Sequence, residues 1–242
     1  MKDLLKRIKN NNFTIGIVGL GYVGLPLSLN FSSNGVKVIG FDVDIKKIES
    51  ISKGESYINH IESGIIKTLR EKELFIATNE FRMIESVDVI ILCVPTPLNK
   101  YKEPDMSFIL DTLDSIKPYL KKNQVLSLES TTYPGTTDEL LKPMLESLGF
   151  RIGSDFFLVY SPEREDPGNP SFSNHNIPKI ISGITKNSAN APCRGGIEIS
   201  CRFGQMLFWP LQHAEHLPQD TSGLTVTLLP VFLPFTINPA AS

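Results

Sequence analysis

A glycine-rich stretch near the amino terminus constrains the fold of this chain more than any other feature. The apolar, β-branched run 14–18 predicts a short buried strand, and it leads directly into Gly19, Gly21 and Gly24, spaced as G-x-G-x-x-G before a potential helix. In such a turn the first glycine makes the tight bend, the second lets a ligand approach the backbone, and the third lets helix and strand pack closely. This order of strand, glycines and helix predicts the first half of a βαβ unit.

A second strand and an acidic residue complete the unit. Another apolar run, 36–41, follows the helix-stopping pair Asn34-Gly35, and Asp42 comes directly after it. An acid at this place accepts both hydroxyls of an adenosine ribose, while the pyrophosphate rests on free N–H groups at the positive end of the helix. The pattern therefore predicts a dinucleotide site, and the alternative is a βαβ unit that binds nothing.

The charges around Asp42 favour NAD over NADP as the dinucleotide. A 2′-phosphate would meet the carboxylate of Asp42, and Asp44 adds to the repulsion. Lys46 and Lys47 are close enough in sequence to weaken this preference. NAD is the expected cofactor.

The overall composition is that of an ordinary globular protein. In 242 residues, 41% are hydrophobic and 21% are charged, and the net charge of −2 favours neither nucleic acid nor an anionic membrane as a partner. No apolar run approaches the length of a membrane span, and residues 1–12 lack the apolar core of a signal peptide. The three cysteines and four histidines show no paired or metal-like spacing, so we expect a cytoplasmic protein without a metal site.

Apolar runs alternate with helical patterns along most of the chain. Strands are expected at 14–18, 36–41, 74–77, 87–94, 125–130, 156–160 and 179–183. Helical spacing falls between them, with Gly54 and Gly149 expected to end two helices and Ser107 to cap another. The alternation predicts an α/β fold, a Rossmann-like doubly wound parallel sheet with right-handed crossovers.

Such a sheet binds ligands at the carboxyl ends of its strands. The loops of interest therefore begin at Gly19, Asp42, Pro95, Thr131 and Ser161, and all of them carry polar or turn-forming residues.

The character of the sequence changes at Lys186. No lysine follows this position, and six scattered prolines interrupt a segment that has neither helical nor strand periodicity (Pro192, Pro210, Pro218, Pro230, Pro234, Pro239). We therefore expect two parts: residues 1–186 as an NAD-binding Rossmann domain, and 187–242 as an unrelated, poorly ordered tail, such as a translated frameshift would produce.

Four motifs at the ends of successive strands connect residues 14–185 to a known family. They are Gly19-Leu20-Gly21-Tyr22-Val23-Gly24-Leu25-Pro26, Cys93-Val94-Pro95-Thr96-Pro97, Glu129-Ser130-Thr131-Thr132-Tyr133-Pro134-Gly135-Thr136-Thr137 and Tyr160-Ser161-Pro162-Glu163-Arg164-Glu165-Asp166-Pro167-Gly168-Asn169. With these motifs the chain resembles the amino-terminal NAD-binding domain of the UDP-glucose/GDP-mannose dehydrogenase family. The last two are most similar to the branch acting on UDP-N-acetylglucosamine.

The resemblance implies a role for particular residues. The cofactor-binding set would be Gly19, Gly21, Tyr22, Val23, Gly24, Asp42, Lys47, Thr96, Thr131 and Glu165. Thr131 would also help to hold a catalytic water, and Glu163 would be the acid–base carboxylate. Read without the resemblance, Thr131 could merely cap a helix and Glu163 could form an ordinary loop ion pair with Arg164.

By resemblance, the reaction is a double oxidation of the C6 alcohol of a UDP-sugar by NAD, through a cysteine thioester, in surface polysaccharide biosynthesis. The family's central helix, through which its members dimerise, its nucleophilic cysteine in a glycine-rich segment and its second α/β domain have no counterpart in this sequence. We therefore expect NAD binding with impaired binding of the UDP-sugar and no turnover, and the oligomeric state stays open. The alternatives are a UDP-glucose or UDP-N-acetylmannosamine 6-dehydrogenase, or a non-catalytic dinucleotide-binding module.

Overall fold

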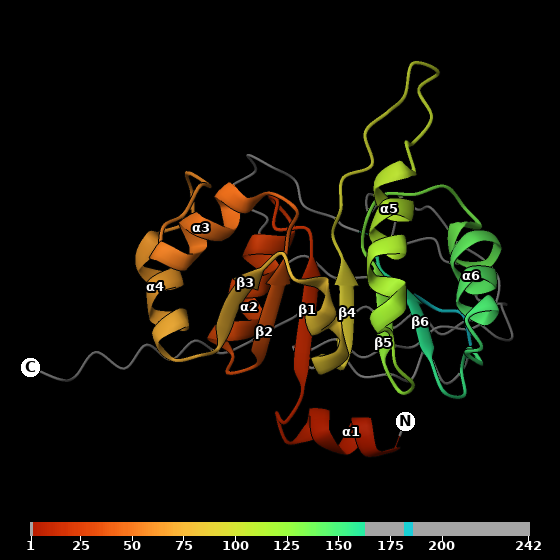
Figure 1. Ribbon diagram of the computed structural model, residues 1–242, viewed down its shortest axis with the longest axis horizontal. Helices are drawn as coiled ribbons and strands as arrows, with labels where there is room; N and C mark the ends of the chain where they lie inside the picture. The colour runs from red at the N-terminus through yellow and green to blue at the C-terminus, as the bar shows by residue number, and fades with distance from the viewer. Residues whose placement is uncertain (1, 163–181, 186–242) are drawn as a thin grey trace, which may run out of the picture.

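The computed structural model describes residues 2–162 and 182–185, which build one sheet with helices on both faces (Figure 1). The strands are β1 (Thr14–Val18), β2 (Lys37–Phe41), β3 (Phe75–Thr78), β4 (Val89–Leu92), β5 (Val125–Leu128), β6 (Phe157–Tyr160) and β7 (Ser182–Gly183). The α-helices are α1 (Lys2–Lys9), α2 (Gly24–Ser33), α3 (Ile45–Lys53), α4 (Ser63–Glu71), α5 (Ser107–Ile116) and α6 (Lys142–Ser147). Shorter turns of helix are η1 (Phe81–Ser86), η2 (Lys117–Tyr119) and the π-helical η3 (Thr136–Leu141).

The strand order is β3-β2-β1-β4-β5-β6-β7, and all neighbours from β3 to β6 are parallel. The chain moves outward in one direction from β1 to β3 and then crosses to the other side of β1 with β4. This arrangement confirms the predicted doubly wound α/β sheet. The exception is β7, which pairs antiparallel with β6, whereas the prediction was a parallel sheet. An apolar run predicts a strand but carries no information about its direction.

Two hydrophobic clusters, one on each face, hold the helices to the sheet. Alternate residues of each strand enter opposite clusters, as Ile17 and Val18 of β1 do. The first cluster receives apolar side chains from α1, α2, α3 and α4, and the second receives them from η1, α5, η3 and α6. Because the strands are buried on both faces, they occur in the sequence as continuous apolar runs.

Of two predictions for helix ends, the one at Gly54 is confirmed and the one at Ser107 is wrong. Gly54 ends α3 in the left-handed region, with a φ of 78°, as expected of a glycine after a helix. The expectation that Ser107 caps α5 is wrong, because Ser107 is already the first helical residue. Its backbone N–H donates instead to Oδ1 of Asp105, at 3.0 Å.

Candidate functional site

The carboxyl ends of β2, β1, β4 and β5 lie side by side, and each leads into one of the predicted loops. Asp42 follows β2, the glycine turn follows β1, Thr96 lies shortly after β4, and Thr131 lies shortly after β5. The strand order reverses between β1 and β4, and a crevice at such a switch point is where doubly wound sheets bind ligands. The sheet therefore brings the predicted residues of four separate segments to one edge.

The glycine turn has the geometry that the spacing predicted. Gly19 has a φ of +95°, and a Cβ there would lie 2.6 Å from the carbonyl oxygen of Cys93. A Cβ on Gly24 would lie 1.8 Å from the carbonyl oxygen of Gly19, so no side chain fits between turn and helix. A Cβ on Gly21 would meet nothing within 4 Å. The turn is thus closely packed at its two ends and open in its middle.

Backbone donors are available beside this open space. In the described part of the chain, the amides of Tyr22 and Val23 donate to no protein acceptor, and Val23 is the N-cap of α2 with no side-chain cap. The exposed N-terminus of a helix carries a partial positive charge and unsatisfied N–H groups. The middle of the turn can therefore accept an anion such as a pyrophosphate.

Asp42 is buried beside the turn, with its side chain 6% exposed and both carboxylate oxygens engaged. Oδ1 accepts the N–H of Asp44 at 2.9 Å, and Oδ2 accepts the N–H of Leu20 at 2.8 Å. Oδ2 also pairs with Nζ of Lys47 at 2.9 Å. The predicted pair Asp42 and Lys47 is thus brought together, and the carboxylate joins the end of β2 to the glycine turn.

The capacity of this carboxylate for a further ligand is limited. An ionised carboxylate accepts about four hydrogen bonds, and three are already made within the protein. Two of the donors are backbone amides, whereas the third is the side chain of Lys47, which is 31% exposed. Lys47 is therefore the donor that can move when another group approaches Asp42.

Tyr57 contacts the glycine turn, and the sequence did not identify it as a site residue. It lies in the loop between α3 and α4, and its hydroxyl donates to the carbonyl oxygen of Leu20 at 2.5 Å. Burial, and then the nearby carboxylates of Asp42 and Asp44, raise the pKa of Tyr57, so the phenol remains protonated at neutral pH. A tyrosine 37 residues away from Leu20 has no spacing that would link it to the glycine turn, because only the tertiary fold brings the two together.

Thr96 and Thr131 reach the same edge on loops that start from anchored residues. Thr96 is partly buried, and Thr131 is exposed in the loop after β5. Just before Thr131, the hydroxyl of Ser130 donates to the carbonyl oxygen of Val94 at 2.6 Å and ties the two loops together. Thr131 does not cap the next helix, because residue 135 is the N-cap of η3.

The motif after β6 is described only at its beginning. Ser161 is fully buried, and its Oγ has no hydrogen-bond partner within the described residues. Glu163 and Glu165, the predicted acid–base and cofactor residues, lie outside the described ranges. Their roles stay predictions.

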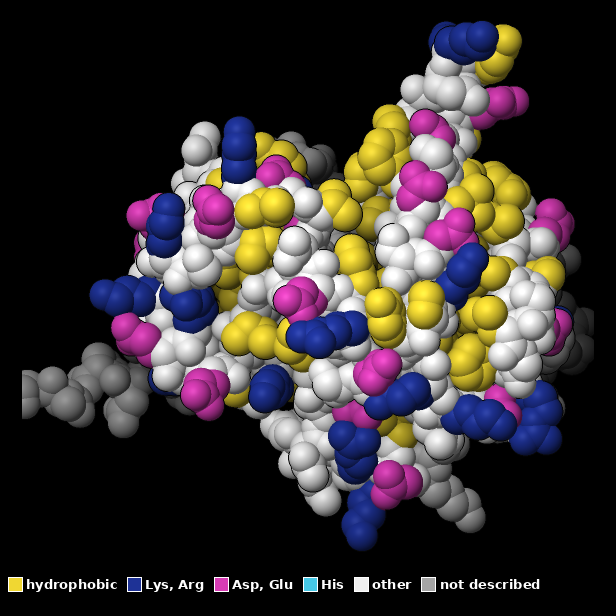
Figure 2. Space-filling view, in the orientation of Figure 1, with side chains coloured by type: hydrophobic (Ala, Val, Ile, Leu, Met, Phe, Trp, Pro, Cys, Tyr) yellow, Lys and Arg dark blue, Asp and Glu magenta, His cyan; other side chains and the backbone are white. Residues whose placement is uncertain are grey.

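The loop between β4 and α5 projects away from the sheet (Figure 1). It folds back on itself through an antiparallel bridge between Leu98 and Pro104. Figure 2 shows hydrophobic and basic side chains at its tip, where Nζ of Lys100 lies 4.9 Å from the ring centre of Tyr101. Leu98 and Tyr101 are strongly exposed, so this loop adds an accessible apolar surface next to the candidate site.

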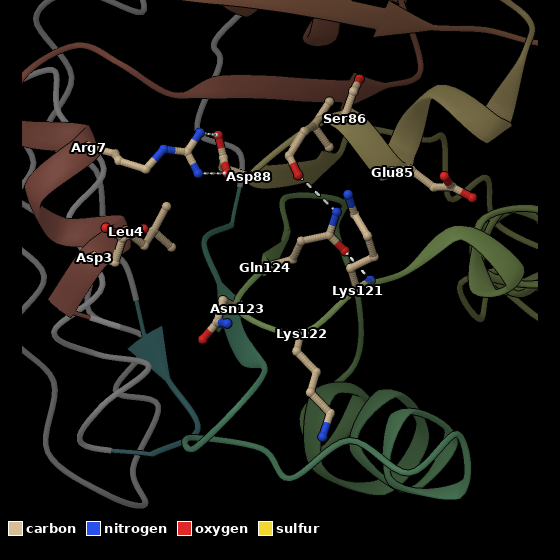
Figure 3. Close-up of a pocket in the computed structure, with 11 residues that line it drawn as sticks. Asp3, Leu4, Arg7, Glu85, Ser86, Asp88, Lys121, Lys122, Asn123 and Gln124 are labelled. Atoms are coloured by element: carbon tan, nitrogen blue, oxygen red, sulfur yellow. Dashed lines mark hydrogen bonds and ion pairs between the residues drawn. The ribbon is translucent and has the colours of Figure 1, made fainter.

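A separate cavity of about 480 Å³ lies at the opposite, amino edge of the sheet (Figure 3). Arg7 of α1 forms a bidentate ion pair there with Asp88, at 2.6 and 2.7 Å. Acidic and basic side chains balance in its lining, which includes Asp3, Glu85 and Asp88 together with Arg7, Lys121 and Lys122. The cavity lies where α1 docks on the sheet, and its balanced charges select no ligand.

Residues 2–162 and 182–185 also bear on metal binding and on membrane insertion. No group of three or more His, Cys, Asp or Glu side chains there could hold a metal ion. Nor is any helix of these ranges both long and apolar enough to cross a membrane.

Comparisons with known proteins agree with this geometry. The model of the UDP-glucose/GDP-mannose dehydrogenase family, NAD binding domain, matches residues 13–195. The chain is 38% identical to UDP-N-acetyl-D-glucosamine 6-dehydrogenase of Salmonella typhi over 176 residues. This alignment covers 72% of this chain and 40% of that protein. It is 35% identical to UDP-N-acetyl-D-mannosamine dehydrogenase of Methanococcus aeolicus over 182 residues. This alignment covers 72% of this chain and 39% of that protein.

Solved structures give the same result. The UDP-N-acetyl-mannosamine dehydrogenase Cap5O from Staphylococcus aureus superposes with a TM-score of 0.68 at 36% identity, covering 74% of this chain and 43% of that one. The chain thus spans about two fifths of the length of the curated relatives it matches.

Proposed function

The chain belongs to the UDP-glucose/GDP-mannose dehydrogenase family, whose NAD-binding domain it carries, and on this premise we propose that it holds NAD for a nucleotide-sugar 6-dehydrogenase of the UDP-N-acetylglucosamine type. The observation that carries the proposal is the open middle of the glycine turn. At Gly21 a ligand can approach the backbone, and next to it lie the amides of Tyr22 and Val23, which have no acceptor among the described residues.

The residues at this edge fit the parts of a dinucleotide. The pyrophosphate would lie against the amides of Tyr22 and Val23 at the N-terminus of α2. Asp42 would accept the hydroxyls of the adenosine ribose, at the end of the strand next to the turn. Thr96, across the switch point on the β4 side, would contact the dinucleotide farther along, and Glu165 would support it from the motif after β6.

Lys47 has two roles in this proposal. It would give up part of its contact with Asp42 when the ribose binds, because among the described donors to that carboxylate it is a partly exposed side chain and the other two are backbone amides. Its charge is also paired with Asp42, which leaves less positive charge for the 2′-phosphate of NADP. The pairing of the Lys47 charge with Asp42 supports a preference for NAD.

When bound, NAD supplies the acceptor for a hydride. Thr131, exposed in the loop after β5, would lie near the reacting carbon and help to hold a water molecule. Glu163 would act as the acid–base carboxylate toward that water. These two assignments rest on the family motifs in which the residues occur.

The identity of the sugar is the least constrained part of the proposal. The relatives named for UDP-N-acetylglucosamine and for UDP-N-acetylmannosamine have similar identities to this chain, 38% and 35%. UDP-N-acetylglucosamine is preferred on the motifs after β5 and β6. UDP-N-acetylmannosamine and UDP-glucose are the alternatives, and each would serve the cytoplasmic synthesis of surface polysaccharide.

The 242-residue chain by itself is proposed to bind NAD without oxidising a UDP-sugar. It spans about two fifths of the relatives, and the family's groups that hold UDP and form the thioester belong mostly to the remainder. We place the boundary of the NAD-binding domain near residue 186, although the family match continues to residue 195. A non-catalytic dinucleotide-binding module is the alternative from another functional class.

Calorimetric titration of the full chain with NAD and NADP tests the cofactor assignment. We expect clear preference for NAD, and Asp42→Ala should weaken NAD binding by about 1–3 kcal/mol through lost hydrogen bonds to a charged group. Asp44→Ala is the matched control, because its side chain caps α3 through the N–H of Lys46 and leaves Asp42 in place. Equal affinities of the wild-type chain for the two dinucleotides would contradict the proposed role of Asp42.

Absorbance of the reduced cofactor tests the proposed lack of turnover. The isolated chain at high concentration, supplied with NAD and each of the three UDP-sugars, should produce none. Steady production that is abolished by Glu163→Gln would show instead that this chain is an enzyme, and the sugar that supports it would identify the substrate.

A further inference from the structure

Leu20, the residue between the first two glycines, is held through both of its peptide groups. Its N–H donates to Oδ2 of Asp42 at 2.8 Å, and its carbonyl oxygen accepts the hydroxyl of Tyr57 at 2.5 Å. The Leu20 side chain is fully buried. The turn is therefore fixed from one side by the proposed ribose-binding acid and from the other by a tyrosine that belongs to no family motif named above.

The loop that carries Tyr57 is itself anchored. The next residue, Ile58, is 3% exposed in the first hydrophobic cluster. The hydroxyl of Ser56 donates to the carbonyl oxygen of Ile58 and accepts its N–H, at 3.0 and 3.1 Å. The N–H of Ser56 in turn donates to Oγ of Ser63, the first residue of α4. The phenol therefore reaches Leu20 from a fixed position.

Fixing the Leu20 carbonyl also fixes the amide that follows it. A trans peptide is planar, so its C=O and N–H point in opposite directions. With the carbonyl of Leu20 directed at Tyr57, the N–H of Gly21 is directed away from Tyr57. Gly21 is also the position with open space around it, so the hydroxyl of Tyr57 sets the peptide orientation at the point where a ligand can approach.

We propose that Tyr57 is a positioning residue for the dinucleotide, which holds the Leu20–Gly21 peptide in the orientation that the pyrophosphate requires. The inference rests on the proposed NAD site and assigns to it a residue from a different segment of the fold. Without the hydroxyl, the carbonyl oxygen of Leu20 loses this hydrogen bond, the peptide is held less tightly, and binding must restrict the additional motion. Tyr57 does not touch the cofactor in this arrangement and acts only through the backbone of the turn.

Tyr57→Phe tests the proposal, because it removes the hydroxyl and keeps the ring that packs against the first cluster. We expect the dissociation constants of NAD and of ADP-ribose to rise by the same factor, about three- to tenfold, as for one lost neutral hydrogen bond. Tyr101→Phe is the matched control, since Tyr101 is 70% exposed on the projecting loop and should leave both constants unchanged.

A spectroscopic measurement separates positioning from a general loss of structure. The amide nitrogen of Gly21 is bonded to the Leu20 carbonyl carbon, so its ¹⁵N resonance in the free protein should shift in Tyr57→Phe. Amides of the amino edge, such as that of Gln124, should not shift. Ser56→Ala, which loosens the loop without changing the phenol, provides a second variant and should weaken both ligands in the same ratio by a smaller factor.

The possible outcomes separate the two proposals. If the wild-type chain binds neither NAD nor ADP-ribose, the proposed function fails, whatever Tyr57 does. If the wild-type chain binds both and Tyr57→Phe binds them equally well, the positioning role is wrong. It is also wrong if affinity falls while the Gly21 resonance is unchanged.

Discussion

In the described part of the chain, buried polar side chains at the amino edge of the sheet have protein partners, whereas two backbone donors at the carboxyl edge have none. At the amino edge, Gln124 is 3% exposed, and its side chain accepts the N–H of Lys121 and donates to the carbonyl oxygens of Ile84 and Val87. Asp88 there accepts both the guanidinium of Arg7 and the N–H of Thr14. At the carboxyl edge, the amides of Tyr22 and Val23 find no acceptor in the described chain.

This difference separates a hollow whose polar groups have protein partners from an edge whose donors are available. The cavity of about 480 Å³ lies at the amino edge, where Arg7, Asp88, Lys122 and Gln124 all have protein partners. The glycine turn at the other edge carries backbone donors beside a helix N-terminus that have no acceptor within the described residues. Unsatisfied polar groups in a fixed geometry therefore favour the carboxyl edge as the proposed ligand site.

The largest expected effect concerns the closely packed end of the carboxyl edge. Gly24→Ala places a Cβ 1.8 Å from the Gly19 carbonyl oxygen, which is backbone and cannot move aside cheaply. We expect the free energy of unfolding to fall by about 3 kcal/mol, at the upper end for overpacking, as measured by denaturant titration. Gly64→Ala in α4 is the matched control, because its Cβ meets nothing within 4 Å, and it should stabilise the protein slightly. Equal stability of the two variants would contradict the contact between turn and helix.

The next effect concerns the closed amino edge. Gln124→Ala leaves the carbonyl oxygens of Ile84 and Val87 and the N–H of Lys121 without their partner, and we expect unfolding to be easier by about 2 kcal/mol. NAD affinity, measured at low temperature where the variant is folded, should not change. Lys121→Ala keeps the backbone N–H and serves as the control. A large loss of NAD binding in Gln124→Ala would show that the two edges are coupled.

The smallest effect separates binding from stability at Gly21, in the open middle of the turn. In Gly21→Ala the new Cβ meets no protein atom, so unfolding should be unchanged or harder by about 0.5 kcal/mol. The same methyl group occupies the space proposed for the pyrophosphate, and NAD affinity should fall about tenfold, or 1.4 kcal/mol. Calorimetry and denaturant titration on one preparation measure both quantities. Unchanged NAD affinity would mean that the open space is not the binding site.

Sequence reasoning found most of the fold because the strands are buried on both faces and so leave continuous apolar runs. It also predicted the tight turn at Gly19 and the close packing at Gly24, since a missing side chain is a local property with a local backbone consequence, whereas the ligand contact at Gly21 stays a prediction. The strand at 156–160 was found as β6, but the direction of β7 was not predicted, because pairing direction depends on how the chain returns to the sheet. The expected cap of α5 at Ser107 was wrong, because Ser107 is already the first residue of the helix and its N–H donates to Oδ1 of Asp105. The backbone path that places Ser107 inside the helix does not follow from residue types.

What the sequence determined by itself was the order of the strands and loops, and with it the edge at which Asp42, Lys47, Thr96 and Thr131 would gather. Parallel strands end on the same side, so positions far apart in the chain can be assigned to one edge without coordinates. Only the tertiary structure decided how these residues use their polar atoms. It showed that Asp42 already has three donors and that Tyr57 holds the carbonyl of Leu20. Hydrogen bonds between distant segments depend on side-chain positions within about 3 Å, and no pattern of residue types along the chain encodes distances at that scale.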